Sequence, residues 1–135
     1  MLPTQSVLAN GNINPSRFVM IDVSVTTGWR AIQATAASLL IVGVSQEGSK
    51  LPPLEGFTNT LAAEADDPFE MFPYMSTALI FSGAAITIGA LVTSDANGKA
   101  VAATSGQLAW GRAFQSAGGA DEKVHIQVLP GVNVP

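Results

Sequence analysis

Only one histidine, His125, is available for acid–base chemistry near neutral pH. It lies in the stretch Glu122-Lys-Val-His-Ile-Gln-Val128, where aliphatic residues alternate with polar ones. In a strand, this alternation places His125 and Gln127 together on the polar face. Catalysis by a histidine would need a nucleophile positioned beside it, and no nucleophile motif accompanies His125. We therefore expect His125 to be a surface or interface residue and the protein not to be an enzyme.

Carboxylates gather in one short stretch, at Glu64, Asp66, Asp67 and Glu70. A calcium loop needs oxygen ligands at alternating positions around a central glycine, and this stretch has apolar residues and a proline between its carboxylates. The segment Asp95-Ala-Asn-Gly98 resembles the start of such a loop but lacks an acidic residue at the closing position. Because the chain also has no cysteine, the sequence predicts no metal site.

Two glycine-rich segments, Gly43–Gly48 and Gly118-Gly119, are candidates for a phosphate cradle. Neither is followed by the Lys-Ser/Thr pair or the helix that such a cradle needs. We read both as turns and expect no cofactor.

Four aromatic residues in the expected strands could stack on sugar or base rings: Trp29, Phe81, Trp110 and Phe114. Aromatic residues in strands are more often part of the core, and we expect that here. The alternative is a carbohydrate-binding or adhesive module displayed on a particle or cell surface. That alternative loses its best residues if Trp29 and Trp110 are both buried.

The elements that would position these residues are short strands separated by turn-forming residues. Eight to ten strands are expected, which indicates an all-β fold, either a small barrel or a sandwich. Residues 57–65 form either one short helix or an excursion loop. Asn97-Gly98 predicts a two-residue type I′ turn, because both residues tolerate positive φ. Pro130 offers no amide donor, so the last strand should end before it.

The turn at Asn97-Gly98 belongs to a pattern that occurs twice. Phe18–Asp22 matches Ala90–Asp95 in character, and Val42–Gln46 matches Trp110–Phe114 around a central glycine. We predict an extended N-terminal arm over 1–16 and a single β domain over 17–135. Two pseudo-repeated halves, about 17–48 and 86–129, make up most of that domain.

The composition of the chain limits the kinds of partner that the protein is expected to bind. The net charge is −4, and the six basic residues form no patch, so we expect no nucleic-acid partner. Charged residues make up only 12% of the 135-residue chain and hydrophobic ones 47%, which predicts an apolar surface covered by protein partners. The uncharged run 71–94 is interrupted by Pro73, Gly83 and Gly89, so we expect strands rather than a membrane span. The N-terminus lacks the basic and apolar regions of a secretory signal.

Several segments resemble one family when they are taken in order. The first half offers Arg17-Phe-Val, Ala34-Thr-Ala36 and Val42–Gly48. The second half offers the hairpin Gly89–Ala103, then Trp110–Phe114, Gly118-Gly119 and Lys123–Val128. This series, over about residues 14–129, resembles the tailed-phage capsid decoration proteins, also called head cement proteins. Ala90 and Arg112 depart from the family wording, and the stretch 52–74 matches least.

The resemblance implies a compact β body of the β-tulip type that forms a homotrimer. It implies a virion protein, made in the host cytoplasm, that binds major capsid protein on the outer capsid surface and stabilises the shell by bridging. We expect the interface residues to lie in the arm, directly after it, and in the poorly matching stretch. These residues are Leu2, Pro3, Val7, Leu8, Asn14, Pro15, Arg17, Phe57, Phe69, Phe72 and Tyr74.

Overall fold

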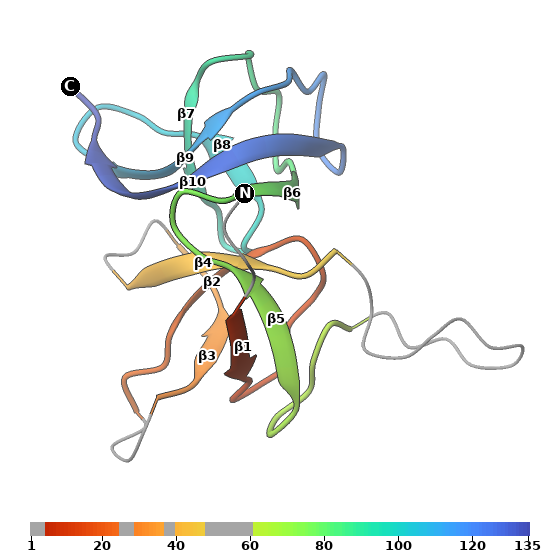
Figure 1. Ribbon diagram of the computed structural model, residues 1–135. Helices are drawn as coiled ribbons and strands as arrows, with labels where there is room; N and C mark the ends of the chain where they lie inside the picture. The colour runs from red at the N-terminus through yellow and green to blue at the C-terminus, as the bar shows by residue number, and fades with distance from the viewer. Residues whose placement is uncertain (1–4, 25–28, 37–39, 48–60) are drawn as a thin grey trace, which may run out of the picture.

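The computed structural model describes residues 5–24, 29–36, 40–47 and 61–135, and in this part of the chain all regular structure is β (Figure 1). Two five-stranded antiparallel sheets pack together, and neither closes into a barrel, so the body is sandwich-like. The described part of the predicted helix or excursion loop, residues 61–65, is not helical. The predicted all-β fold is therefore confirmed in its sandwich form.

We call residues 5–72 the first half and residues 77–133 the second half, because each contributes one sheet. The strands of the first half are β1 (Gln5–Leu8), β2 (Phe18–Ile21), β3 (Ala31–Gln33), β4 (Ile41–Ser45) and β5 (Pro68–Phe72). The strands of the second half are β6 (Thr77–Phe81), β7 (Leu91–Ser94), β8 (Ala100–Ala102), β9 (Leu108–Ala113) and β10 (Lys123–Asn133).

The two sheets have the same strand order. The first runs β1-β5-β4-β2-β3 and the second β6-β10-β9-β7-β8, which is the same order counted from the first strand of each half. The isolated bridges match as well, since Ile13 pairs with Ala63 in the first half and Ile86 with Ala117 in the second. Each repeated unit is thus larger than the predicted segments, because 17–48 omits β1 and β5 and 86–129 omits β6.

Strands β4 and β9 each have a glycine at the same position of the repeated unit, where a side chain would collide with the neighbouring strand. A Cβ at Gly43 would strike the carbonyl oxygen of Phe72 on the neighbouring strand and lie 2.9 Å from Met71 Cγ. A Cβ at Gly111 would lie 2.8 Å from Ile126 Cδ1 and 3.2 Å from the Gln127 carbonyl oxygen. In both halves the glycine lets the next strand and its side chain approach closely.

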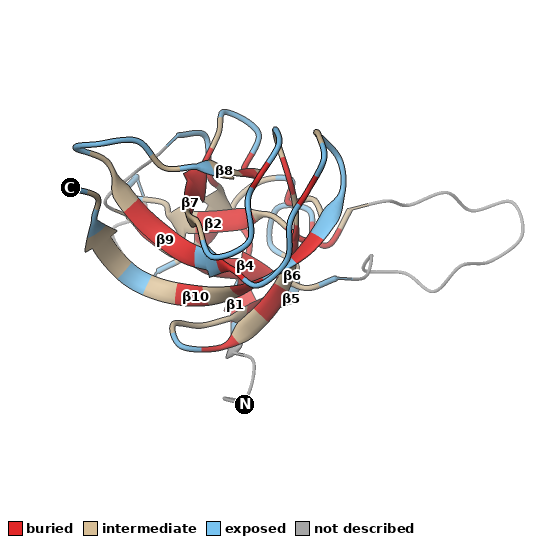
Figure 2. Cartoon of the chain, turned by 90° about the horizontal axis from the view of Figure 1, so that it is seen from above, coloured by how far each residue is buried: buried red, intermediate tan, exposed pale blue. Residues whose placement is uncertain are grey.

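Two apolar clusters hold the body together, and Figure 2 shows the buried positions running along the strands with exposed ones concentrated in the loops. The first cluster lies within the first half and includes Ile13, Val19 and Met71. The second is shared, because Phe18 and Val44 of the first half belong to the same cluster as residues such as Trp110, Ile126 and Val128 of the second half. Burial of this shared cluster joins the halves.

Residues 5–16 do not form the predicted extended arm. Gln5–Leu8 pairs with β5, and Val7, Ala9 and Ile13 are buried in the cluster of the first half. The prediction of an arm rests on turn-forming residues in this segment. In the structure these residues form a bend that folds the chain back across its own sheet. Residues 1–4 lie outside the described part of the chain.

The predicted type I′ turn at Asn97-Gly98 is also wrong. Gly98 has a φ of 75°, but Asn97 is not among the residues with positive φ. The Gly98 amide donates to the Asp95 carbonyl over 3.3 Å, and one Asp95 carboxylate oxygen accepts the amides of Asn97 and Lys99. Asp95 therefore builds a longer turn, in which only the glycine needs a left-handed conformation.

Strand β10 continues past Pro130 to Asn133, against the prediction. Its register against β9 shifts between Val128 and Val132, and its pairing with β6 extends only over Lys123–Gln127. Pro130 thus lies at an irregularity where no β6 partner needs its amide, which is one of the places a sheet tolerates proline.

Candidate functional site

Three of the predicted interface residues, Leu2, Pro3 and Phe57, lie outside the described residues. Val7 and Phe69 face the core of the first half and are only 4% and 3% exposed. Their burial leaves little side-chain surface for a partner. Leu8, the neighbour of Val7 on β1, is 42% exposed and points away from that core.

Asn14, Pro15 and Arg17 are half-buried, and Arg17 reaches the boundary between the halves. The guanidinium carbon of Arg17 lies 4.8 Å from the centre of the Phe81 ring, and Nη1 donates to the Pro15 carbonyl over 3.0 Å. Burial lowers the pKa of Arg17, while the carboxylates of Asp121 and Asp95 act in the opposite direction. Arg17 thus contributes mainly to contacts within the chain.

Phe72 and Tyr74 are half-buried against the shared cluster. The Tyr74 hydroxyl donates to the Ile41 carbonyl over 2.7 Å, and its ring stacks on Trp110 at 6.0 Å between centroids. Burial raises the pKa of Tyr74. Both side chains connect the end of the first half to the second half.

The two tryptophans differ in exposure. Trp110 is 4% exposed and packs in the shared cluster, as the sequence predicts. Trp29 is 48% exposed, and Phe114 is 44% exposed, so the prediction that these two are core residues is wrong. Trp29 precedes β3 and Phe114 follows β9, where the chain leaves the sheet and alternation no longer determines burial. Of the two residues that decide the sugar-binding alternative, only Trp29 is exposed.

His125 is exposed on β10, while the aliphatic residues on either side of it are buried, as the alternation predicts. Its amide donates to Gln115 Oε1 over 2.9 Å, and its ring nitrogen Nδ1 lies 3.1 Å from the same oxygen. The Gln115 side chain thus binds both backbone and ring of His125. This contact ties the β9–β10 connection to the strand.

The predicted acidic cluster lies on the surface of the first half. Asp66 forms an ion pair with Arg30, and Asp67 accepts the Glu64 amide over 3.0 Å. Within the described residues, no three His, Cys, Asp or Glu side chains are grouped so as to hold a metal ion. The described part of the chain also contains no helix with the length and hydropathy of a membrane span.

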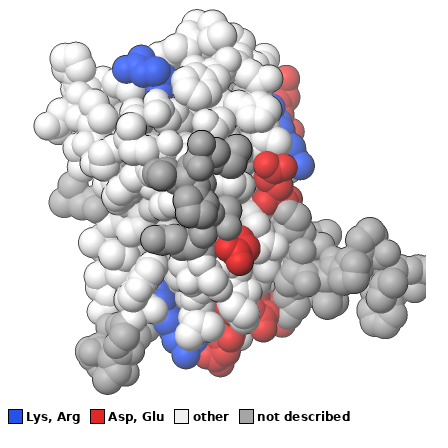
Figure 3. Space-filling view, in the orientation of Figure 1, with Lys and Arg blue, Asp and Glu red and all other residues white. Residues whose placement is uncertain are grey.

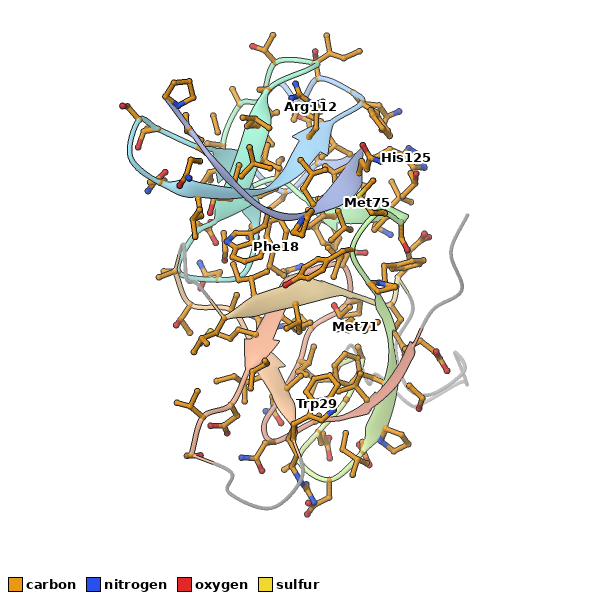
Figure 4. All side chains as sticks on the ribbon, turned by 60° about the vertical axis from the view of Figure 1, so that its left-hand side comes forward. Phe18, Trp29, Met71, Met75, Arg112 and His125 are labelled. Carbon is orange, nitrogen blue, oxygen red and sulfur yellow. The ribbon has the colours of Figure 1, made fainter. Side chains whose placement is uncertain are left out.

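All but one of the large exposed apolar side chains of the described residues lie at the two ends of the molecule, and the exception is Met75 (Figure 4). Among the described residues they are Leu8, Val23, Trp29, Met75, Ile88 and Phe114, with exposures of 42%, 71%, 48%, 54%, 61% and 44%. Sequence reasoning named only Leu8 among them as an interface residue. Val23 and Ile88 continue the alternation of Ile21 and Ile86 but lie beyond or outside the strands, so the sequence pattern carries no signal that they are exposed.

Leu8, Val23 and Trp29 share one end, which we call the first-half end. The segments that carry them are tied together there, since Asn10 Nδ2 donates to Asp22 and the Asn10 amide donates to the Ala31 carbonyl. Ile88 and Phe114 share the other end, the second-half end. The Ile88 amide donates to Ser116 Oγ over 2.9 Å, which holds the two segments together.

Figure 4 shows Trp29 and Arg112 at opposite extremes of the molecule, with Phe18 between them. The net charge also differs between the two halves. In the second half, Asp95, Asp121 and Glu122 balance Lys99, Arg112 and Lys123, so the net charge of −4 arises from the rest of the chain. On the face shown in Figure 3, wide areas carry no charged side chain.

No protein-family model matches the sequence, and a comparison with curated proteins finds no significant match. Among solved structures, the chain is similar to the head fiber gp8.5 N base of bacteriophage phi29, with a TM-score of 0.65 and 14% sequence identity. The alignment covers 100% of both chains. At this identity the comparison shows a shared fold.

Proposed function

We propose that this protein is a structural component of a phage head, which binds the outside of the capsid and bridges major capsid proteins. The observation that carries the proposal is the fold likeness to a head-fibre base over the full length of both chains. It agrees with the sequence resemblance to decoration proteins, which covers about residues 14–129. We further propose that the protein self-associates as a homotrimer.

The properties of the body support a structural role. A bridging protein needs a rigid scaffold and exposed apolar contacts, and the two joined sheets and the two apolar ends supply both. The proposed role needs no catalytic residue, and it assigns none to His125, whose ring contacts the Gln115 amide. A net charge of −4 suits a protein that does not face packaged DNA.

Purified protein mixed with undecorated capsids tests the proposal directly. We expect saturable occupancy, and capsids that withstand a higher temperature before they rupture. Binding without greater heat resistance would remove bridging from the proposal. A protein that does not bind the capsids of its own phage at any concentration would overturn the proposal.

The contribution of the N-terminus needs a short truncation. Removal of residues 1–16 would delete β1 and the buried residues Ala9 and Ile13, so we expect the first half to unfold. Removal of residues 1–4 leaves β1 intact, and we expect it to weaken capsid binding without a change in the melting temperature. Removal of Pro135, which is exposed, is the matched control at the other terminus. Equal capsid binding by the wild-type protein, the variant without residues 1–4 and the C-terminal control would contradict a role for the first four residues.

A carbohydrate-binding module is the second candidate, and the exposure of Trp29 favours it. A bound sugar would stack on the exposed indole and change its fluorescence. Titration of a sugar panel into a Trp110→Phe variant, whose emission comes from Trp29 alone, tests this candidate. Unchanged emission with every sugar would dismiss it.

A further inference from the structure

The contacts between the two halves define a joint. The turn between β7 and β8 lies on the first half, where Gly98 and Asn97 offer carbonyl oxygens to the Phe18 amide and to Gln33 Nε2, both over 2.8 Å. Beside this turn, the Phe81 amide donates to the Ser16 carbonyl over 3.1 Å. We call the second-half part of this joint, the β7–β8 turn with Phe81, the turn side. We call the first-half part, with Ser16, Phe18 and Gln33, the seat side.

The first-half end contains the counterparts of the turn side. Arg30 pairs with Asp66 in the first half as Lys99 pairs with Asp121 in the second, and both aspartates have positive φ. Trp29, which precedes Arg30, therefore occupies the place that Gly98 occupies before Lys99. Leu8 corresponds to Phe81, because each is the last residue of the first strand of its half.

The second-half end contains the counterparts of the seat side. Ser16 and Gly89 both have positive φ, of 54° and 86°, and each lies two residues before the second strand of its half. Leu91 therefore corresponds to Phe18. Within the chain the turn side of the second half covers Phe18, which is fully buried, whereas Leu91 is only half-buried and its partner on β9, Arg112, is exposed.

The exposed apolar residues coincide with these two vacant surfaces. Leu8, Val23 and Trp29 lie on the free turn side, and Ile88 and Phe114 lie beside the free seat. Among the described residues, Met75 is the remaining large exposed hydrophobic residue, and it lies at neither end. Exposed apolar patches of this kind mark interaction surfaces.

The charges at the two ends are complementary. At the first-half end the exposed carboxylates of Glu64 and Asp66 outnumber the cation of Arg30, which pairs with Asp66. The second-half end carries the exposed guanidinium of Arg112. Arg112 Nη1 donates to the Gly89 carbonyl over 2.9 Å, which holds the cation beside the free seat. The joint within the chain pairs the same charges, with Asp95 and Asp121 near Arg17.

We propose that the first-half end of one copy docks on the second-half end of another, in the arrangement that joins the two halves of a single chain. The occupant of each vacant surface is thus a second copy of this protein. Because the two surfaces differ, the contact is heterologous and produces a ring if its rotation closes and a filament if it does not. This inference specifies the contact for the self-association in the proposed function and does not depend on capsid binding.

Sedimentation velocity of the purified chain over a concentration series, without capsids, tests the inference. We expect wild-type protein to associate reversibly. Two variants each remove one end: Leu8→Ser with Trp29→Ala, and Ile88→Ser with Phe114→Ser. We expect each to bind itself about tenfold more weakly or worse, since central apolar anchors dominate such contacts. Met75→Ser is the matched control for loss of an exposed apolar residue, and we expect it to associate like wild type.

A mixture of the two end variants gives the sharpest result. Each variant keeps the end that the other lacks, so we expect a one-to-one complex that neither variant forms alone. An isologous contact would not be restored by mixing, and a mixture that stays monomeric overturns the inference if circular dichroism shows both variants folded. Wild-type protein that stays monomeric throughout also overturns it, even where capsid binding is intact.

Discussion

The two halves share one strand order, but one row of side chains across the sheet is covered in the first half and not in the second. In the first half this row is Phe18, Val44 and Phe72 across β2, β4 and β5, and the second half covers it. In the second half the matching row is Leu91, Arg112 and Gln127 across β7, β9 and β10, and Arg112 is exposed.

This difference separates the demands of the fold from those of the joint. On the face toward the interior of each half, Gly43 and Gly111 occupy the same position because a Cβ there would crowd the neighbouring strand. On the opposite face, the row that the other half covers is entirely apolar, whereas the matching row carries the polar Arg112 and Gln127 beside Leu91. The row around Phe18 therefore reports on the joint, and the row around Leu91 reports on a surface that remains free within one chain.

Truncation of the matched pair Phe18 and Leu91 should give the largest difference between the halves. Phe18 is fully buried, and we expect Phe18→Ala to lower the free energy of unfolding by about 3–5 kcal/mol. Leu91 is half-buried, and we expect Leu91→Ala to cost about 1 kcal/mol. Urea denaturation followed by circular dichroism measures both values. Equal losses would show that the two rows are packed alike.

Two glycines with positive φ give a smaller effect and isolate the joint more narrowly. Gly98 has a φ of 75°, and a Cβ there would lie 3.0 Å from Gln33 Cγ and 3.2 Å from the Phe18 carbonyl oxygen. Gly89 has a φ of 86° and nothing within 4 Å of such a Cβ. We expect Gly89→Ala to cost about 1 kcal/mol from backbone strain alone.

Gly98→Ala adds crowding to the same strain, and we expect about 1–3 kcal/mol beyond the cost at Gly89. Thermal unfolding of the two variants under identical conditions gives the difference, which is the part due to the joint. If both alanines cost the same, the turn between β7 and β8 can move away from the first half without loss.

Sequence reasoning succeeded where a periodic pattern acts on a regular strand. Alternation along Lys123–Val128 predicts which side chains are buried, and the paired glycines indicate that a unit occurs twice. Both depend on local geometry that any strand in a two-layer fold must satisfy. For the same reason, the all-β fold could be predicted without knowledge of the partners of each strand.

The errors arose where a contact with a residue outside the short motif overrides the signal of that motif. Asn97-Gly98 favours a two-residue turn, but the Asp95 carboxylate binds two backbone amides and lengthens it. The turn-formers between Gly11 and Pro15 suggest a free arm, yet Ile13 in their midst is fully buried against the body. The apolar ends were missed because Trp29 lies outside the strands, where period-two patterns carry no information.

Acid should reveal a last and smaller difference between the halves. In the first half, hydrogen bonds from Asn10 and Ser24 lower the pKa of Asp22. In the second half, the hydrogen bond and charge of Lys99 lower the pKa of Asp121. A carboxylate with a lowered folded-state pKa stabilises the protein above its unfolded value near 3.8, and this stabilisation is lost as the pH falls through the folded value. Both aspartates therefore contribute at neutral pH and lose that contribution in acid.

We expect Asp22→Asn and Asp121→Asn each to be less stable than wild type at pH 6, and the three unfolding curves to converge as the pH falls below the folded pKa values. Salt then distinguishes the halves. The Asp121 effect depends on an exposed ion pair and should shrink in concentrated sodium chloride, because mobile ions screen it. The Asp22 effect depends on neutral donors and should persist. Denaturation at two pH values and two salt concentrations measures all of these differences. If the Asp22 effect is as sensitive to salt as that of Asp121, the negative charge of Asp22, rather than its hydrogen bonds from Asn10 and Ser24, stabilises the first-half end.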